Sequence, residues 1–450
     1  MIIKGKKFPG GIHPFYGKEF TQSGKTEILP LPEKVIIPLS QHIGAPCKPL
    51  VTVGSLVKKG ELIGETTGFI AAPVHASISG KVIQVGPAPH PSGNQILSVT
   101  IESDKKDEWI GGFEEHPDYI DLDGESIKKL ITKAGIVGLG GAAFPTHVKL
   151  NPPKEKKIHT LILNGVECEP YLTSDHRLMV EQPKDVIEGL KLLTRILNVK
   201  KAYIGIEDNK QDALQIMEDA VKSEGTRLIE TQVVELETKY PQGGEKQLIQ
   251  AILGLEVPNG GLPMDLGIVV QNVGTAAAIF EAVRFGRPLI DRIITVTGRG
   301  VMQPKNLRVR IGTMVQDIIK FCGGFAGEPG KVIMGGPMMG PAQYTLDTPV
   351  VKGTGGILIF PKEEVSIEES RACIHCAACI EACPVGLLPN MLSITAEVLN
   401  FTEARKFHPL SCIECGCCSY VCPSRRPIVH QIRHIKMDIA STKKKVVMVT

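Results

Sequence analysis

Eight of the chain's 12 cysteines fall into two short runs near the C-terminal end. The first run is Cys373-x2-Cys376-x2-Cys379-x3-Cys383, followed by Pro384, and the second is Cys412-x2-Cys415-x2-Cys418-x3-Cys422, followed by Pro423. This spacing allows three thiolates of one loop to converge on one cubane. Structural zinc, the alternative, normally takes two pairs from two loops, so a third cysteine two residues further on has no role there. The runs therefore predict two [4Fe-4S] clusters and one-electron transfer.

Both runs match the pattern of bacterial two-cluster ferredoxins, in which the fourth cysteine of each run ligates the other cluster. Crossed ligation assigns Cys373, Cys376, Cys379 and Cys422 to one cluster, and Cys412, Cys415, Cys418 and Cys383 to the other. We expect Pro384 and Pro423 at the first position of a helix, where a missing N–H is tolerated. The four cysteines outside the pattern are predicted to be buried thiols: Cys47, Cys168, Cys322 and Cys417.

A glycine-rich segment offers a second kind of chemistry. Residues 138–149 read GLGGAAFPTHVK and link two stretches with helical spacing. Glycines permit close approach of the backbone, and free N–H groups at a helix start favour a phosphate, to which Lys149 would add a charge. An apolar stretch then delivers Asn164 and Glu169 at the end of a predicted parallel strand, where α/β proteins bind ligands. The alternatives are an ordinary turn for the glycines and loop capping for the two polar residues.

Four regions, which differ in their pattern of predicted helices and strands, would position these residues. Predicted short strands at 35–39, 51–53, 62–64, 81–85 and 96–101 indicate a small all-β domain, in which His75 stands nearest to the modifiable lysine of a carrier domain. Predicted helices at 126–134 and 177–197 alternate with strands at 161–163, 202–206, 228–236 and 267–270, which indicates a parallel α/β sheet. Strands return at 291–364 around a helix at 313–322, with Thr313 as its N-cap. Beyond residue 367 the chain is predicted to be mainly helical.

Bulk composition narrows the class of protein. The chain has 450 residues and a formal net charge of +3, which gives no indication of a nucleic-acid partner. No stretch approaches the roughly 20 apolar residues of a membrane span, and residues 1–4 lack the apolar region of a secretory signal. We therefore expect a reducing compartment, in which clustered cysteines favour metal over disulfides.

The glycine segment, residues 164–170 (NGVECEP), 240–245 (YPQGGE) and 271–275 (QNVGT) resemble, in this order, the NADH- and FMN-binding subunit of respiratory complex I. The resemblance implies that one set of residues surrounds FMN: Gly138, Gly140, Gly141, Ala142, Lys149, Asn164, Glu167, Asn272 and Thr275. It implies that a second set faces the NADH nucleotide: Phe144, Glu169, Tyr240, Gly243 and Glu245. Leu139, Val166 and Gly244 depart from the family pattern, in which arginine, aspartate and glutamate stand.

The whole chain resembles the C subunit of the Rnf ion-translocating electron-transport complex, as residues 8–14 (FPGGIHP), 38–46 (PLSQHIGAP) and 72–80 (APVHASISG) show. The resemblance implies a multidomain α/β and α+β fold. We expect an N-terminal extension (1–33), an unmodified lipoyl-like barrel-sandwich hybrid (34–105) and a Rossmann-like FMN/NADH-binding domain (120–288). A β-grasp, SLBB-like domain (289–365), a ferredoxin-like module with two [4Fe-4S] clusters (366–440) and a basic tail (441–450) complete the prediction.

This resemblance implies a function in which NADH gives a hydride to FMN and the two clusters pass single electrons to partner subunits. The implied protein is an NAD-linked oxidoreductase subunit of a ferredoxin:NAD⁺ translocase, which binds the cytoplasmic face of the membrane without spanning it and reaches ferredoxin indirectly. One alternative is a non-catalytic iron–sulfur relay with a vestigial flavin fold, as in the A subunit of the sodium-pumping NADH:quinone reductase. The other is the flavin subunit of a soluble hydrogenase or formate dehydrogenase.

Cations near the C-terminus suggest a docking surface. Ile428, Ile432 and Ile435 share one side of a predicted helix, while Arg433 and Lys436 point elsewhere. We expect these cations, with the basic tail, either to lie on a solvated face or to meet acidic groups of a membrane subunit.

Overall fold

The structure, a computed structural model, describes residues 2–112, 115–223, 229–366 and 369–449, with side chains up to residue 442. The predicted basic tail therefore lies mostly outside the described side chains. No described helix is long and apolar enough to cross a membrane.

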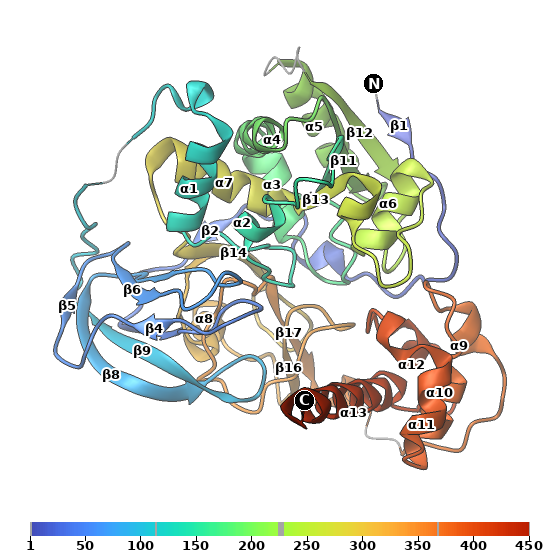
Figure 1. Cartoon of the computed structure of the whole chain (residues 1–450). Helices are drawn as coiled ribbons and strands as arrows, with labels where there is room; N and C mark the ends of the chain where they lie inside the picture. The colour runs from blue at the N-terminus through green and yellow to red at the C-terminus, as the bar shows by residue number, and fades with distance from the viewer. Residues whose placement is uncertain (1, 113–114, 224–228, 367–368, 450) are drawn as a thin grey trace.

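The first domain is built from two short antiparallel sheets around one apolar core (blue in Figure 1). One sheet has the order β3 (Lys34–Pro38), β9 (Gln95–Ser103), β8 (Gly80–Pro89), β5 (Leu56–Val57). The other has the order β4 (Lys48–Pro49), β6 (Leu62–Glu65), β7 (Val74–His75). The strand predicted at 51–53 is wrong, because a turn from Thr52 to Ser55 takes up those hydrogen bonds. His75 is buried in β7 and presents no exposed tip.

The α/β domain carries an all-parallel sheet, as predicted. Its order is β1 (Ile3–Lys4), β12 (Glu230–Leu236), β11 (Lys201–Glu207), β10 (Thr160–Asn164), β13 (Ile268–Asn272). The strands are apolar on both faces because helices cover both. On one side lie α1 (Gly124–Lys133), α4 (Pro183–Leu197) and α7 (Val273–Phe285), and on the other lies α6 (Glu245–Leu253). Helices α2 (Thr146–Lys149), α3 (Ser174–Glu181) and α5 (Gln211–Ser223) complete the domain.

The single helix predicted for 177–197 is wrong. Helix α3 ends at Glu181 and α4 begins at Pro183. Proline lacks the N–H that would continue the helix, and it disfavours the helical conformation of the residue before it. Gln182 accordingly has a φ of −133°.

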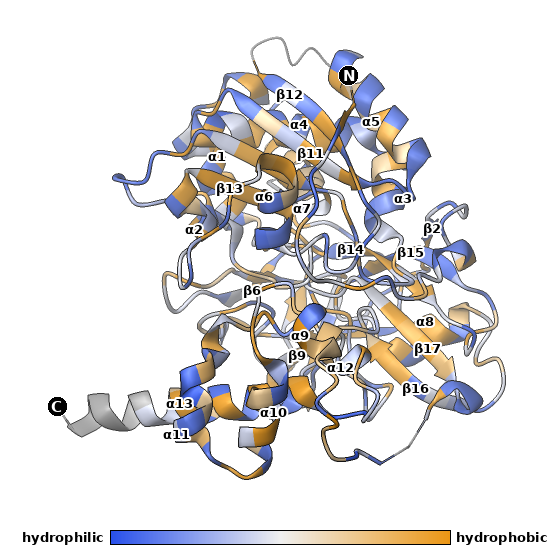
Figure 2. Cartoon of the chain, turned by 90° about the vertical axis from the view of Figure 1, so that its right-hand side faces the viewer, coloured by the Kyte–Doolittle hydropathy of each residue, from blue (hydrophilic) through white to orange (hydrophobic). Residues whose placement is uncertain are grey.

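The third domain is a mixed sheet of order β16 (Pro329–Met334), β17 (Gly356–Pro361), β14 (Asp291–Thr297), β15 (Lys305–Arg310), β2 (Glu27–Ile28), with helix α8 (Val315–Phe321). Apolar residues colour β16 and β17 orange in Figure 2. The predicted N-cap is wrong, because Met314 precedes α8 and the Thr313 hydroxyl donates to Arg310 O instead. The predicted N-terminal extension thus supplies an edge strand to two domains, β1 to the α/β sheet and β2 to this one.

The C-terminal module is helical, as predicted, and lies below the α/β domain in Figure 1 (red). It contains α9 (Ala378–Glu381), α10 (Pro389–Glu397), α11 (Phe401–Ala404), α12 (Cys417–Tyr420) and the long α13 (Ile428–Val449). The apolar side of α13 is buried with α10 in one core. Pro384 and Pro423 do not begin helices, because turns closed by Gly386 N–Cys383 O and Arg425 N–Cys422 O follow each run.

Candidate functional site

Two hollows in the C-terminal module are each lined by four cysteines. The inner hollow is lined by Cys383 with Cys412, Cys415 and Cys418. The outer hollow is lined by Cys422 with Cys373, Cys376 and Cys379. Each hollow therefore takes three cysteines from one run and the fourth from the other, which is the grouping that crossed ligation requires. Cys417 is buried and does not line the inner hollow.

The two hollows fit four-iron clusters. Within the described residues no three His, Cys, Asp or Glu side chains close on one point, as ligands of a single ion do. The cysteines instead surround a space, which suits a group that offers each thiolate its own iron. Backbone N–H groups already point at two of the sulfurs, from Leu387 to Cys383 Sγ and from Glu414 to Cys412 Sγ, both at 3.3 Å. Such hydrogen bonds tune a cluster's reduction potential.

The inner hollow lies against the α/β domain. The Tyr240 hydroxyl donates to Cys415 O at 2.8 Å, and Gln247 Nε2 donates to Pro384 O at 3.3 Å. Cys415 is buried, while Cys376 of the outer hollow is exposed. A cluster in the inner hollow would therefore be the one nearer to the α/β domain.

The glycine segment forms an exposed loop at the end of the parallel sheet. Gly138 N donates to Phe144 O at 2.8 Å, and Leu139 N donates to the Thr275 hydroxyl at 2.9 Å. At the loop's tip Gly141 has a φ of +111°, and a Cβ there would meet nothing within 4 Å. In the part of the chain that the structure describes, the N–H groups of 140–142 donate to no protein acceptor. Free N–H groups in an open, left-handed loop fit a phosphate.

Other predicted flavin residues gather beside this loop. Asn164 and Asn272 end β10 and β13 and stand opposite each other in the sheet register. A Cβ on Gly140 would lie 3.3 Å from the Asn272 Cβ. Asn164 Nδ2 donates to Gly243 O at 2.9 Å, and two residues further on Glu245 pairs with Lys149 at 2.5 Å. The structure thus brings the loop, both strand ends and residues 243–245 together at the carboxyl-terminal end of the sheet.

Three predicted site residues are used elsewhere. The Glu167 carboxylate accepts hydrogen bonds from the Ser174 hydroxyl and from the N–H groups of Asp175 and His176, so it caps the start of α3. The Glu169 carboxylate accepts from Met338 N and Met339 N, at 3.1 and 2.9 Å. Tyr240 is 1% exposed and bound to Cys415. The structure does not bring these side chains to the glycine loop, and Phe144 is half-buried with its carbonyl closing the loop.

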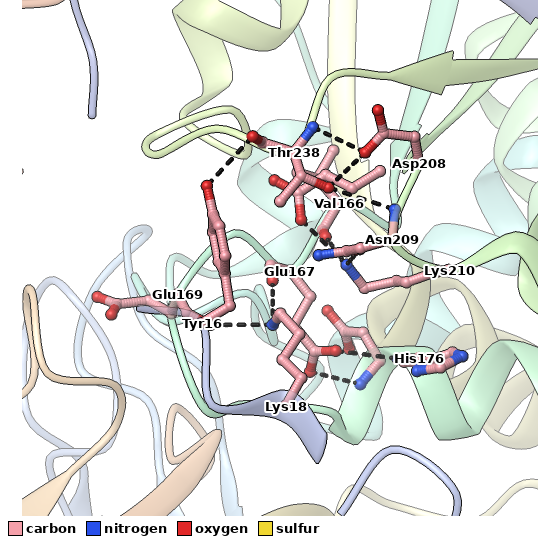
Figure 3. Close-up of polar contacts among 12 residues, drawn as sticks. Tyr16, Lys18, Val166, Glu167, Glu169, His176, Asp208, Asn209, Lys210 and Thr238 are labelled. Carbon is pink, nitrogen blue, oxygen red and sulfur yellow. Dashed lines mark hydrogen bonds and ion pairs between the residues drawn. The ribbon is translucent and has the colours of Figure 1, made fainter. Parts of the chain in front are cut away.

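Two buried lysines hold the loop at 165–172, and sequence reasoning missed both (Figure 3). Lys18 Nζ donates to the carbonyls of Glu167, Glu169 and Leu172, at 2.8, 3.1 and 2.6 Å. Lys210 Nζ donates to Val166 O at 2.8 Å and to the Glu207 carboxylate at 3.0 Å. Burial lowers the pKa of Lys18 to about 8. No local pattern marks Lys18, because its partners are about 150 residues away in the sequence.

Two further charged residues beside the glycine loop were also missed. Asp175 Oδ2 accepts from Asn272 Nδ2 at 2.6 Å, and burial, with the nearby Glu167 charge, raises the pKa of Asp175 to about 7. Arg292 Nη2 donates to Leu139 O at 3.0 Å, and its Nε donates to Thr354 O. Residues from α3 and β14 therefore support the loop.

The predicted docking cations are not free. Arg433 Nε and Lys436 Nζ each bind one oxygen of Glu414, at 2.7 and 2.6 Å. These cations therefore tie α13 to the second cysteine loop while Arg433 stays exposed, and their contact with a membrane subunit stays a prediction.

Family models match four consecutive parts of the chain. They are the RnfC barrel sandwich hybrid domain at 6–106, the Nuo51 FMN-binding domain at 131–281, the SLBB domain at 293–342 and the 4Fe-4S dicluster domain at 372–425.

Three relatives cover most of the chain. The C subunit of the proton-translocating ferredoxin:NAD(+) oxidoreductase complex from Clostridium ljungdahlii is 50% identical over 96% of this chain and 94% of its own length. The C subunit of the Na(+)-translocating ferredoxin:NAD(+) oxidoreductase complex from Acetobacterium woodii is 48% identical over 99% of this chain and 100% of its own length. The C subunit of the ion-translocating oxidoreductase complex from Rhodobacter capsulatus is 42% identical over 88% of this chain and 76% of its own length.

The chain belongs to the C-subunit family of Rnf ion-translocating oxidoreductase complexes. The predicted fold class and order of domains are confirmed, and so are FMN and [4Fe-4S] clusters as the cofactors of these domains. The barrel domain and the doubled cluster domain match in the same chain, which supports this family over a soluble hydrogenase or formate dehydrogenase subunit. The exact domain boundaries and the individual binding residues remain predictions.

Proposed function

We propose that this Rnf C subunit is the electron-input subunit of a ferredoxin:NAD⁺ oxidoreductase, peripheral to the cytoplasmic face of the membrane. Its relatives carry the names of proton- and Na(+)-translocating ferredoxin:NAD(+) oxidoreductases. FMN, when bound, supplies the conversion between a two-electron hydride exchange with NADH and single electrons. The partners are the other subunits of the complex, and ferredoxin is reached through them.

The residues of this chain position the reaction. The N–H groups of 140–142 bind the FMN phosphate at the loop tip, Thr275 holds the loop through Leu139 N, and Asn164 and Asn272 stand beside it at the ends of β10 and β13. The Lys149–Glu245 pair closes one side. Eight cysteines bind the two clusters, and the outer cluster faces the partners.

One observation carries the proposal, which is that a single short segment touches both centres. Tyr240, at the start of 240–245, donates to the inner-hollow residue Cys415, while Gly243 and Glu245 contact Asn164 and Lys149 beside the glycine loop. The flavin site and the inner hollow are therefore neighbours across this segment. This neighbourhood supports the proposed order of flavin, inner cluster and outer cluster.

The test is flavin and iron analysis of the anaerobically purified chain, with bleaching of the clusters by NADH as the readout. We expect bound FMN, about eight irons per chain and bleaching by NADH. Gly141→Val is expected to lose FMN and NADH bleaching while it keeps both clusters, because a side chain at this left-handed position displaces the phosphate. Gly327→Val is the matched control, since Gly327 also has a positive φ, +89°, and open space around it.

The non-catalytic relay is the second candidate, and Leu139 and Val166 favour it. Both side chains are buried and apolar where the flavin-binding family has arginine and aspartate. Wild-type protein that holds eight irons but neither retains added FMN nor bleaches with NADH would establish the relay.

A further inference from the structure

Helix α13 is tied to the inner cysteine loop through Glu414, the second of the two residues between Cys412 and Cys415. Both carboxylate oxygens of Glu414 are bound, one by Arg433 and one by Lys436. Lys436 Nζ also donates to Cys412 O at 2.7 Å. The N–H of Glu414 in turn donates to the Cys412 sulfur. These contacts place two cations and one anion beside Cys412, a predicted ligand of the inner cluster.

The outer loop differs at the position of Glu414, although the outer hollow has a cation of its own, the buried Arg426, which pairs with Glu397 at 2.7 Å. His375 takes the place of Glu414 in the first run, and the two residues share a left-handed φ, +55° and +58°. His375 is exposed, and in the described parts of the chain it makes neither an ion pair nor a side-chain hydrogen bond. At this position the two loops therefore share a backbone conformation but carry a different type of side chain.

A net positive charge next to one cluster has a predictable effect. Reduction adds an electron to the cluster, and a neighbouring cation stabilises the reduced state more than the oxidised state. Glu414 cancels one of its two cations, which leaves one positive charge. Lys436 is only 22% exposed at its side chain, so water screens it less than a free surface charge.

We propose that Lys436 and Arg433, held in place by Glu414, raise the reduction potential of the cluster in the inner hollow. This proposal rests on the proposed ligation of the two clusters. The three residues are positioning and tuning groups that touch neither NADH nor flavin. Their effect is to make the inner cluster a better electron acceptor than it would be without the two cations.

The test is an EPR-monitored redox titration of the reconstituted full chain, in which the signal that survives Cys376→Ser identifies the inner cluster. Lys436→Met is expected to reduce the ratio of reduced to oxidised inner cluster about tenfold at a fixed ambient potential, which is about 59 mV for a one-electron couple. Glu414→Gln is expected to move the same midpoint in the opposite direction. Lys436→Arg should restore the wild-type value, and the outer midpoint should not move in any of them.

The opposite directions of the two midpoint shifts distinguish an effect of charge from the effect of a loosened loop. A structural role alone would move Lys436→Met and Glu414→Gln in the same direction, and this outcome, or an unmoved inner midpoint, overturns the proposal. Arg405→Met is the matched control, because Arg405 pairs with Asp438 on the same helix and has no contact with the loop among the described hydrogen bonds. Wild-type protein with only four irons would instead refute the ligation itself.

Discussion

At the scale of single residues, Cys383 belongs to one cysteine run by sequence and to the other by position. It lines the inner hollow with three cysteines of the second run. We expect Cys383→Ala to lose the inner cluster and to keep the outer one, so that iron falls from about eight to about four per chain. Iron and sulfide analysis with EPR measures this. Cys417→Ala, a buried cysteine that does not line the hollow, should keep both clusters, and loss of only the outer cluster in Cys383→Ala would refute crossed ligation.

Glu169 predicts a pH dependence of stability. Burial raises its pKa from 4.5 to about 7, so the native carboxyl holds its proton more tightly than the unfolded chain does. This protonation contributes on the order of 3 kcal/mol to the free energy of unfolding. The contribution is complete below about pH 4.5 and is lost as the pH rises through about 7. In Glu169→Gln the side chain does not titrate. The Tm of Glu169→Gln relative to the wild type should therefore be higher at pH 8 than at pH 5, and parallel Tm curves would show that the pKa is not raised.

At the scale of helices and strands, α13 covers both hollows. Ile432 lines the inner hollow, Ile428 lines the outer one, and both side chains are 1% exposed. Ile432→Ala is expected to cost about 2–4 kcal/mol of unfolding free energy and to let solvent reach the inner cluster. The measurement is the rate at which that cluster bleaches in air, beside denaturant unfolding. Met437→Ala, at an exposed position of the same helix, should bleach at the wild-type rate.

Local pattern decided which elements were predictable. The cysteine runs and the apolar strands could be read directly, because their spacing is a property of a few consecutive residues. The break between α3 and α4 was also present in the sequence, at Pro183, but the apolar periodicity continues across it. The partners of Glu414 and Lys18 were not predictable, because they meet only after elements 19 to about 150 residues apart have packed together. The contact of Tyr240 with Cys415 was unpredictable for the same reason, since it joins two domains 175 residues apart in the sequence.

At the scale of the whole molecule, the proposed order of the centres makes the outer hollow the point where electrons leave. Cys376 is exposed, and beside it the side chain of Ile374 is 66% exposed. Ile374→Glu should leave the reduction of both clusters by NADH unchanged in the isolated chain, but it should lower co-purification with the other subunits, because a charge would be buried at the contact. Pull-down of the tagged subunit measures this. Met302→Glu, an exposed position on the SLBB domain, is the control, and equal recovery of the partners in both variants would place the contact elsewhere.

The first 28 residues complete two sheets whose other strands are synthesised much later. Ile3 pairs with Val234, and Ile28 pairs with Arg308. At a synthesis rate of about 5–20 residues per second, β1 waits on the order of tens of seconds for β12 to leave the ribosome, and β2 waits longer for β15. The buried amine of Lys18, whose carbonyl partners lie at 167–172, has to wait for most of that time as well. The beginning of this chain therefore folds long after it is synthesised, and a chaperone has that time to bind the nascent N-terminal segment.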